Sequence, residues 1–452
     1  MRKITIRIFS IFILAASWKI SNAVEIKKVE KDIKEGEFSS EKKNDIDVLK
    51  EAVGKALRWK LKTGDVIEIR KKSIQDIQIS NEKQPKSIFS KHVQREVINR
   101  IILNTLGVDP VNGFLVEGSF HSFVNYKDNT SGLYQEEDSQ DSTFYIQPRG
   151  IFIVPPGNYM PNIRNIPVFP LDKDPLDHSH VMKEGDTWQF PGIEIMRVEE
   201  LENIPMDASY EYIGKENINV GNGTKTIHKI LYNVQFNHNL KKTLKPENPR
   251  KIFGYVMAKL IWDEKEGMPY YMTEDYDIVI MYNNGINHEF HISSKTNYLK
   301  KQKVDLTEKN KTQKEITDNL NQYFKKNEID VQSVTKGISI RIPDVLFNID
   351  TSDLNSQSIK VLQTVSRILK KYMVSKQILI RGHTDNTGTI IHNQELSNQR
   401  AMAVAKYLAD NYNIPVESLS YEGVGSDMPL ADNNTPSGRQ KNRRVEIILL
   451  DN

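Results

Sequence analysis

Ile378-Leu-Ile-Arg-Gly-His-Thr-Asp385-Asn-Thr-Gly388 is the stretch that decides the fold of this chain, together with the segment Asn393-Gln-Glu-Leu-Ser397-Asn-Gln-Arg400-Ala401. It opens with a short apolar run, typical of a buried strand, and continues into turn residues. The apolar positions of the second segment keep helical spacing, which places Arg400 about two turns into a helix, on or beside its buried face. Asp385 follows the carboxyl end of the strand, where open α/β sheets usually hold their ligands. The stretch therefore predicts an acidic and a basic side chain at the mouth of a small α/β domain.

Two groups of residues in this part of the chain resemble a known family. The first group is Gly382-His383-Thr384-Asp385, Gly388, Leu396-Ser397 and Arg400-Ala401, and the second is Gly423-Val-Gly425, Pro429, Asn433 and Gly438-Arg439-Gln-Lys-Asn442-Arg443-Arg444-Val445-Glu446. In this order and spacing they resemble the signature of OmpA-like peptidoglycan-associating domains. The similar region covers about residues 311 to 452, under a third of the chain. The resemblance implies a protein of a Gram-negative-type or spirochaete-like envelope.

The composition limits the classes of protein to which the chain can belong. Its 452 residues are 38% hydrophobic, which is enough to give each of two or three domains a core. The 62 basic and 59 acidic residues are interspersed, so the net charge of +3 gives no reason to expect a nucleic-acid partner. Cysteine is absent, which excludes disulfides, thiolate metal sites and the acylated cysteine of a lipoprotein.

Residues 1–23 have the order of a secretory signal peptide. Arg2, Lys3 and Arg7 form the charged end, Ile8 to Ala16 form the apolar core, and Ser21 to Ala23 supply small residues for cleavage. The apolar core has about half of the ~20 residues that a membrane-spanning helix needs. We therefore expect an exported protein of the periplasm that is associated with the cell wall, with the outer membrane as an alternative location.

The next two segments differ sharply in composition and in hydrophobic pattern. Residues 24–54 are dominated by Lys, Glu, Asp and Ser, and predict a flexible arm because they bury too little apolar surface to offset the entropy of ordering. Residues 55–298 contain many short apolar or alternating runs, joined by turns such as Asp263 to Gly267 and Asn283 to Gly285. They predict one β-rich domain, a sandwich or a curved sheet, whose role no motif indicates.

One helix is expected to interrupt these strands, from about Phe89 to Leu106, because Val93, Val97, Ile101 and Ile102 would lie on one side of it. An outer-membrane barrel is an alternative for the region, since some proteins with a similar C-terminal domain carry one. Short strands with charges on both faces do not favour it. The other alternative is a ligand-binding or transport component tethered to the wall.

Residues 299–311 are a polar, lysine-rich linker, and residues 312–452 form the C-terminal domain. A helix is expected from about Thr312 to Asn327, and a second helix should be capped by Asn355. Alternating helices and strands imply a mixed sheet with helices packed on it. The whole chain is thus predicted to be α+β and multidomain, with a β-rich N-terminal domain followed by an OmpA-like α/β domain.

The resemblance implies that Asp385 and Arg400 bind the third residue of the peptidoglycan stem peptide. It also implies that the same pocket is lined by Thr384, Asn393 and Leu396. Diaminopimelate, a common third residue, carries an ammonium and a carboxylate on one carbon, which a carboxylate and a guanidinium complement through charge-assisted hydrogen bonds. The sequence does not distinguish diaminopimelate from ornithine, which lacks the carboxylate that Arg400 would hold. It also leaves open whether Asp385 and Arg400 simply pair with each other.

Structural or secondary roles are assigned to other residues of the motifs, namely His383, Arg439, Asn442, Arg443 and Arg444. We expect the arginines to bridge carboxylates and loop carbonyls, with glycan or peptide contact as the alternative, and the ring of His383 to be hydrogen-bonded within the loop. A metal or catalytic site at His383, Asp385 and His392 is not favoured, because the chain has no His-Glu-x-x-His, no Gly-x-Ser-x-Gly and no cysteine. We expect no cofactor and no enzymatic activity.

The predicted function is therefore that of a non-catalytic envelope protein anchored to peptidoglycan, with the outer membrane or another envelope protein as a candidate partner of the β-rich domain. Flagellar stator proteins bear a similar wall-binding domain, but they need a membrane helix with an ion-carrying carboxylate ahead of it. No such apolar run is present after the leader.

Overall fold

The computed structural model describes residues 56–83, 90–127, 132–155, 167–170, 181–197, 201–221, 223–240, 245–301, 306–325, 329–334, 337–343, 347, 351–373, 376–412 and 414–451. The predicted signal peptide and polar arm lie outside these residues. The chain divides into two compact units. Unit 1 holds the described residues up to Gln94, with Ile98–Phe120 and Gln140–Lys301, and unit 2 holds Arg95–Val97, His121–Ser139 and the described residues from 306 onward.

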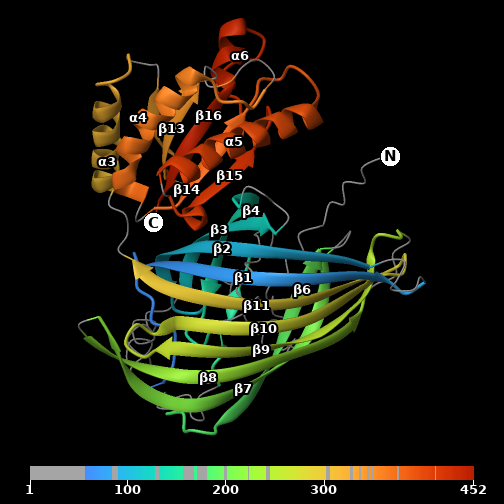
Figure 1. Ribbon diagram of the computed structural model, residues 1–452. Coiled ribbons are helices and arrows are strands. Elements are labelled where there is room, and N and C mark those ends of the chain that lie inside the picture. The colour runs from blue at the N-terminus through green and yellow to red at the C-terminus, as the bar shows by residue number, and fades with distance from the viewer. Residues whose placement is uncertain are drawn as a thin grey trace, which may run out of the picture. The chain divides into compact units, whose positions relative to one another are not determined.

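Long strands make up most of unit 1. Their order in the sheet is β4-β3-β2-β1-β11-β10-β9-β8-β7-β6, and the pairs from β1 through β11 to β6 are antiparallel. Figure 1 shows β7 to β11 bending together as one curved sheet. The bounds are β1 Val66–Asn81, β2 Ser90–Asp109, β3 Gly113–Tyr126, β4 Tyr134–Ile146, β5 Phe152–Ile153, β6 Thr187–Arg197, β7 Leu201–Val220, β8 Gly223–Asn239, β9 Pro249–Asp263, β10 Met268–Tyr282 and β11 Ile286–Lys301.

Alternation of apolar and polar residues produces these strands. In β8, the side chains of Ile230, Tyr232, Val234 and Phe236 are buried, and the residues between them are exposed. This period of two is what a strand with one covered face requires. The prediction of a β-rich N-terminal part is confirmed, although the strands are longer than the apolar runs suggested.

The predicted helix from Phe89 to Leu106 is wrong, because residues 90–106 belong to β2. Val97, Ile101 and Leu103 are buried on one face of the strand. Positions that are four residues apart share a face in a helix and also in a strand, since four is both close to one helical turn and a multiple of two. The sequence spacing could not distinguish the two structures, and pairing within the sheet decided between them.

The core of unit 1 contains a cluster of large aromatic side chains. The rings of Trp59 and Trp262 meet edge to face at 5.4 Å, and Phe169 meets Trp262 in the same way at 4.8 Å. All three side chains are fully buried. Edge-to-face contacts add roughly 0.5–1.5 kcal/mol each beyond the burial of apolar area.

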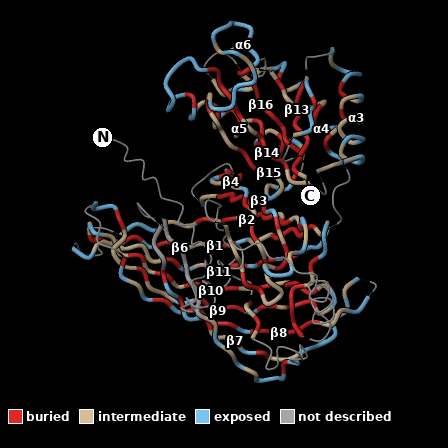
Figure 2. Tube along the Cα trace, turned by 180° about the vertical axis from the view of Figure 1, so that it is seen from behind, coloured by how far each residue is buried: buried red, intermediate tan, exposed pale blue. Residues whose placement is uncertain are grey.

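Unit 2 contains a mixed sheet with helices packed on it. Its strands lie in the order β12-β13-β16-β14-β15, with β14 and β15 parallel and the other pairs antiparallel. β16 is buried along its whole length (Figure 2). The bounds are α3 Leu306–Leu320, β12 Asp330–Val334, β13 Gly337–Pro343, α4 Ser356–Met373, β14 Ile378–His383, α5 Ile390–Tyr412, a 3-10 turn Val416–Ser418, β15 Leu419–Gly423, α6 Pro436–Asn442 and β16 Arg444–Leu450.

Two local details of unit 2 bear on the sequence predictions. The predicted cap Asn355 accepts a hydrogen bond from the backbone N–H of Ser358 at 2.9 Å, and α4 begins there as expected. α3 begins at Leu306, inside the predicted linker and earlier than the expected helix, because Lys, Glu and Gln are good helix formers even where they are solvated. Among the helices that the structure describes, none has the length and apolar character that crossing a membrane would need.

Candidate ligand-binding site

Asp385 lies in the loop that follows β14, and its carboxylate is almost fully buried. One carboxylate oxygen accepts hydrogen bonds from the backbone N–H of Thr387 at 2.9 Å and from the Thr387 hydroxyl. The other accepts from Nη1 of Arg443 at 2.8 Å. Burial would raise the pKa of Asp385, but the hydrogen bonds from Thr387 and Arg443 and the charge of Arg443 outweigh it and lower the pKa. The site therefore holds a fixed negative charge at neutral pH.

Helix α5 places two further side chains of the predicted pocket. Asn393 and Arg400 both lie on its buried face, about two turns apart. The Asn393 side-chain amide donates to the backbone oxygen of Asp385 at 3.3 Å, which ties the helix to the loop. Nε of Arg400 donates to the backbone oxygen of Thr351 at 3.0 Å, and its guanidinium lies 5.1 Å from the centre of the Phe347 ring. These contacts hold the guanidinium by a hydrogen bond and a cation–π interaction.

Two glycines allow α5 to approach the sheet closely. A Cβ at Gly382 would lie 2.1 Å from the backbone oxygen of Ser397, and a Cβ at Gly423 would lie 2.2 Å from the backbone nitrogen of Asn398. The hydroxyl oxygen of Ser397 accepts from the backbone N–H of Gly425 at 2.9 Å. The glycines of the motif thus fix the position of the helix that carries Asn393 and Arg400.

The sequence left open a pairing between Asp385 and Arg400, and the ion pair in the structure is a different one. The charged partner of Asp385 is Arg443, which follows the last residue of α6. The short helix is capped by Thr435, whose hydroxyl accepts from the backbone N–H of Gly438 at 3.0 Å. Asn442 is fully buried and accepts from two backbone N–H groups of the preceding loop, those of Leu430 at 2.8 Å and Ala431 at 2.9 Å. The motif contained Arg443, but only the folded loop shows which carboxylate it reaches.

His383 is the last residue of β14 and is fully buried. The expected hydrogen bond of its ring within the loop is wrong, because neither ring nitrogen has a hydrogen-bond partner in the described structure, and Nε2 lies 3.6 Å from Glu446. Burial, followed by the charges of Arg444, Arg381 and Arg341, lowers the pKa of His383 to about 2. The ring is therefore a neutral core group. Nε of Arg444 donates to Glu446 at 2.8 Å, which compensates both buried charges.

The remaining predicted residues lie around the same end of unit 2. Thr384 is buried, and its backbone N–H donates to the backbone oxygen of Gly425 at 2.9 Å. Leu396 is half-buried on α5, and Nη1 of Arg439 donates to the backbone oxygen of Asn433 at 2.9 Å. His392 is exposed, and the described residues contain no cluster of three metal-ligating side chains.

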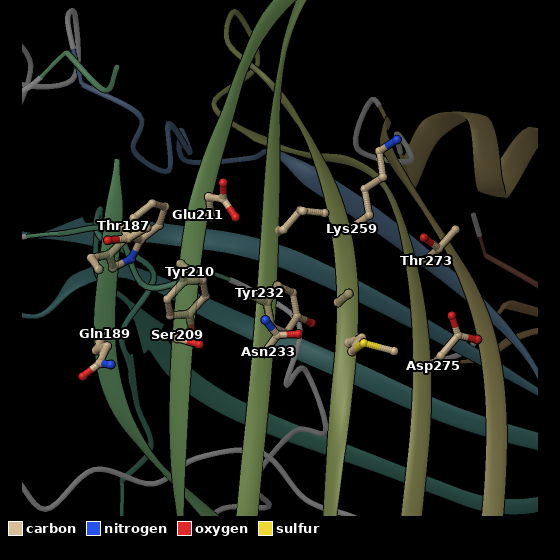
Figure 3. Close-up of a pocket in the computed structure, with 14 residues that line it drawn as sticks. Thr187, Gln189, Ser209, Tyr210, Glu211, Tyr232, Asn233, Lys259, Thr273 and Asp275 are labelled. Carbon is tan, nitrogen blue, oxygen red and sulfur yellow. The ribbon is translucent and has the colours of Figure 1, made fainter. Parts of the chain in front are cut away.

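Unit 1 has a groove of about 640 Å³ on the exposed side of β6 to β10 (Figure 3). Side chains from the five strands form two cross-strand rows along it. The rows are Thr187, Glu211, Leu231, Lys259 and Thr273, and Gln189, Ser209, Asn233, Met257 and Asp275. Most of these side chains are polar, so the groove does not favour a lipid ligand.

The C-terminal part of the chain is similar in sequence to known proteins. Residues 346–443 match the OmpA family. Outer membrane porin F of Pseudomonas aeruginosa is 38% identical over 103 residues, which are 23% of this chain and 29% of that protein. The outer-membrane lipoprotein YfiB of the same species is 38% identical over 105 residues, 23% of this chain and 61% of that protein. The peptidoglycan-binding protein ArfA of Mycobacterium bovis is 39% identical over 105 residues, 23% of this chain and 32% of that protein.

The chain spans less than two thirds of the length of each of these relatives. The similarity lies in the C-terminal part, where the motifs from Gly382 to Asp385 and from Gly438 to Glu446 occur. The chain therefore carries an OmpA-family domain at its C-terminus, as these motifs predict.

Proposed function

We propose that this protein is a non-catalytic envelope protein that attaches to peptidoglycan by binding the stem peptide with its OmpA-like domain. The observation that carries the proposal is the buried, ionised carboxylate of Asp385 at the carboxyl end of β14, beside the helix that holds Arg400. The negative carboxylate of Asp385 and the positive guanidinium of Arg400, held in one domain, complement the ammonium and the carboxylate at the zwitterionic end of diaminopimelate.

The existing contacts leave Asp385 able to receive such a ligand. A carboxylate offers about four acceptor positions, and three of them are occupied by Thr387 and Arg443. The ligand ammonium would take the fourth. A guanidinium carries five N–H donors, so the bond from Arg400 to Thr351 does not prevent it from holding the ligand carboxylate. In a wall with ornithine, Arg400 would meet a backbone or terminal carboxylate instead.

A single site of this kind binds weakly. Charge-assisted hydrogen bonds contribute roughly 1.5–3 kcal/mol each, which corresponds to a Kd of about micromolar to millimolar for one stem peptide. The polymer repeats the ligand, so several copies of the protein near one wall bind more firmly than one site would. Residues 1–23 would direct export, residues 24–54 would form the arm, and the OmpA-like domain would hold the β-rich part in the periplasm.

Co-sedimentation of the full chain with purified peptidoglycan tests the proposal. The test variants are Asp385→Asn and Arg400→Met, and the controls are Asp410→Asn, on the exposed end of α5, and Arg367→Met, on the exposed side of α4. We expect at least tenfold weaker binding for each test variant and unchanged binding for each control. Free diaminopimelate should compete, whereas 1,5-diaminopentane, which has the same two ammonium groups but no carboxylate, should not.

Circular dichroism establishes that the variants are folded. If folded Asp385→Asn and Arg400→Met pellet with the wall as well as the unchanged protein does, these residues do not form the binding site and the proposal fails.

A further inference from the structure

A second pocket lies wholly within unit 1, where β7, β8 and the turn between β9 and β10 meet. It has a volume of about 290 Å³ and is lined by four separate segments of the chain, residues 56–60, 181–184, 212–215 and 264, together with His228 of β8. This volume is close to that of the smallest ligand pockets, about 300 Å³.

His228 is buried and lines this pocket. Its Nδ1 lies 2.8 Å from the hydroxyl of Tyr212, so Nε2 is the ring nitrogen that is left for a ligand. Nε2 has no hydrogen-bond partner within the described residues and is 3.6 Å from the nearer carboxylate oxygen of Glu264. A buried polar atom without a partner costs free energy, so a ligand in the pocket that forms a hydrogen bond with Nε2 would remove this cost.

An irregularity in the sheet shapes the same pocket. The register between β7 and β8 shifts between Tyr212 and Gly214, and Gly214 has a φ of 135°, which strongly favours glycine. A bulge of this kind re-aims side chains and is frequent beside functional sites. After the bulge, Lys215 lies directly opposite His228. A Cβ at Gly214 would lie 3.6 Å from a carboxylate oxygen of Glu184, so this acid lies over the bulge.

Charges of both signs surround His228. Lys60 and Lys215 supply two cations, and Glu184 and Glu264 supply two carboxylates. Nζ of Lys60 donates to the backbone oxygen of Glu264 at 3.1 Å. In the described part of the chain, the side chains of Glu184 and Lys215 make neither a hydrogen bond nor an ion pair. A simple anion would be repelled by the two acids and a simple cation by the two lysines, whereas a zwitterion is attracted by both pairs.

Part of the pocket lining is apolar. Leu57 and Met182 are both buried and line the pocket. We propose that this pocket binds a small zwitterion of the α-amino-acid class with an apolar side chain. Its carboxylate lies against Lys215 and Nε2–H of His228, its ammonium lies against Glu264 and Glu184, and its side chain contacts Leu57 and Met182. With the ring proton on Nε2, Nδ1 is the acceptor for the Tyr212 hydroxyl, which lies 2.8 Å away.

Saturation-transfer NMR on the full-length protein, with L-leucine as the probe, tests this site. The two reference compounds are 4-methylpentanoate, which is leucine without its ammonium, and 3-methylbutylamine, which is leucine without its carboxylate. We expect L-leucine to bind and each reference compound to bind at least tenfold more weakly. Absence of leucine binding, or equal binding of the three compounds, would overturn the assignment.

Substitutions then locate the bound leucine. Lys215→Met and Glu264→Gln should weaken leucine binding at least tenfold. The matched controls are Glu216→Gln and Lys229→Met, because these residues neighbour Lys215 and His228 in the strands, point to the opposite face and form an ion pair of 2.7 Å there. Equal losses in test and control variants would refute the site. Peptidoglycan binding should not change in any of the four, since the two sites belong to different units.

Discussion

Replacement of Gly382 by alanine should damage both the stability of unit 2 and its proposed binding site. The added Cβ would lie 2.1 Å from the backbone oxygen of Ser397, whereas an ordinary contact needs about 3.4 Å. Neither atom can swing aside, because one is attached to the backbone of β14 and the other belongs to the backbone of α5. Helix α5 must therefore move away from the sheet by roughly 1 Å.

The size of the effect follows from this collision. Overpacking typically costs about 1–3 kcal/mol, and a contact between backbone atoms belongs at the upper end. A loss of about 3 kcal/mol changes the unfolding equilibrium more than a hundredfold. Because α5 carries Asn393 and Arg400, the same shift moves them away from Asp385, and we expect peptidoglycan binding to weaken at least tenfold.

Urea denaturation with two optical signals separates the units. Trp59, Trp188 and Trp262, three of the four tryptophans, belong to unit 1, and every described helix belongs to unit 2. The helical circular-dichroism midpoint should fall in Gly382→Ala, and the tryptophan midpoint should stay. Gly107→Ala is the control, because a Cβ at Gly107 meets no atom within 4 Å. An unchanged helical midpoint with undiminished peptidoglycan binding would refute the reasoning.

Two further predictions concern buried polar groups. Glu68 is fully buried between Arg100, Arg70 and Lys301, and their attraction and hydrogen bonds outweigh burial and lower its pKa from 4.5 to about 2. The ionised carboxylate of Glu68 stabilises unit 1 by about 3 kcal/mol above pH 4.5, and this stabilisation is lost as the pH falls towards 2. The free energy of unfolding, followed by tryptophan fluorescence, should therefore fall over this pH window more steeply than in Glu68→Gln. Equal pH dependence in the two proteins would contradict this. Asn442→Ala leaves loop N–H groups unpaired and should lower the stability of unit 2 by roughly 1–3 kcal/mol, measured by the same helical signal. An unchanged midpoint would show that this loop does not depend on Asn442.

Local sequence patterns were sufficient to predict many of the helices and strands of unit 2. Helical spacing and the cap residue Asn355 placed α4, and the glycines and turn residues after β14 placed Asp385 at the end of a strand. These features depend on neighbours a few residues away, which the sequence shows directly. The motif at Gly438 to Glu446 also predicted the family that the C-terminal part matches.

Contacts between residues far apart in the chain could not be predicted from the sequence and are seen only in the tertiary structure. The apolar residues of β2 are four apart, a spacing that fits a helix and a strand equally, and only pairing with neighbouring strands resolved the ambiguity. The partner of Asp385 could not be inferred either, because Arg443 is 58 residues away and reaches the carboxylate only after α6 has formed. The pocket around His228 joins four distant segments. The sequence by itself determined the local elements and the motif, and the tertiary structure decided which charges meet, because ion pairs and pockets form where distant segments pack together.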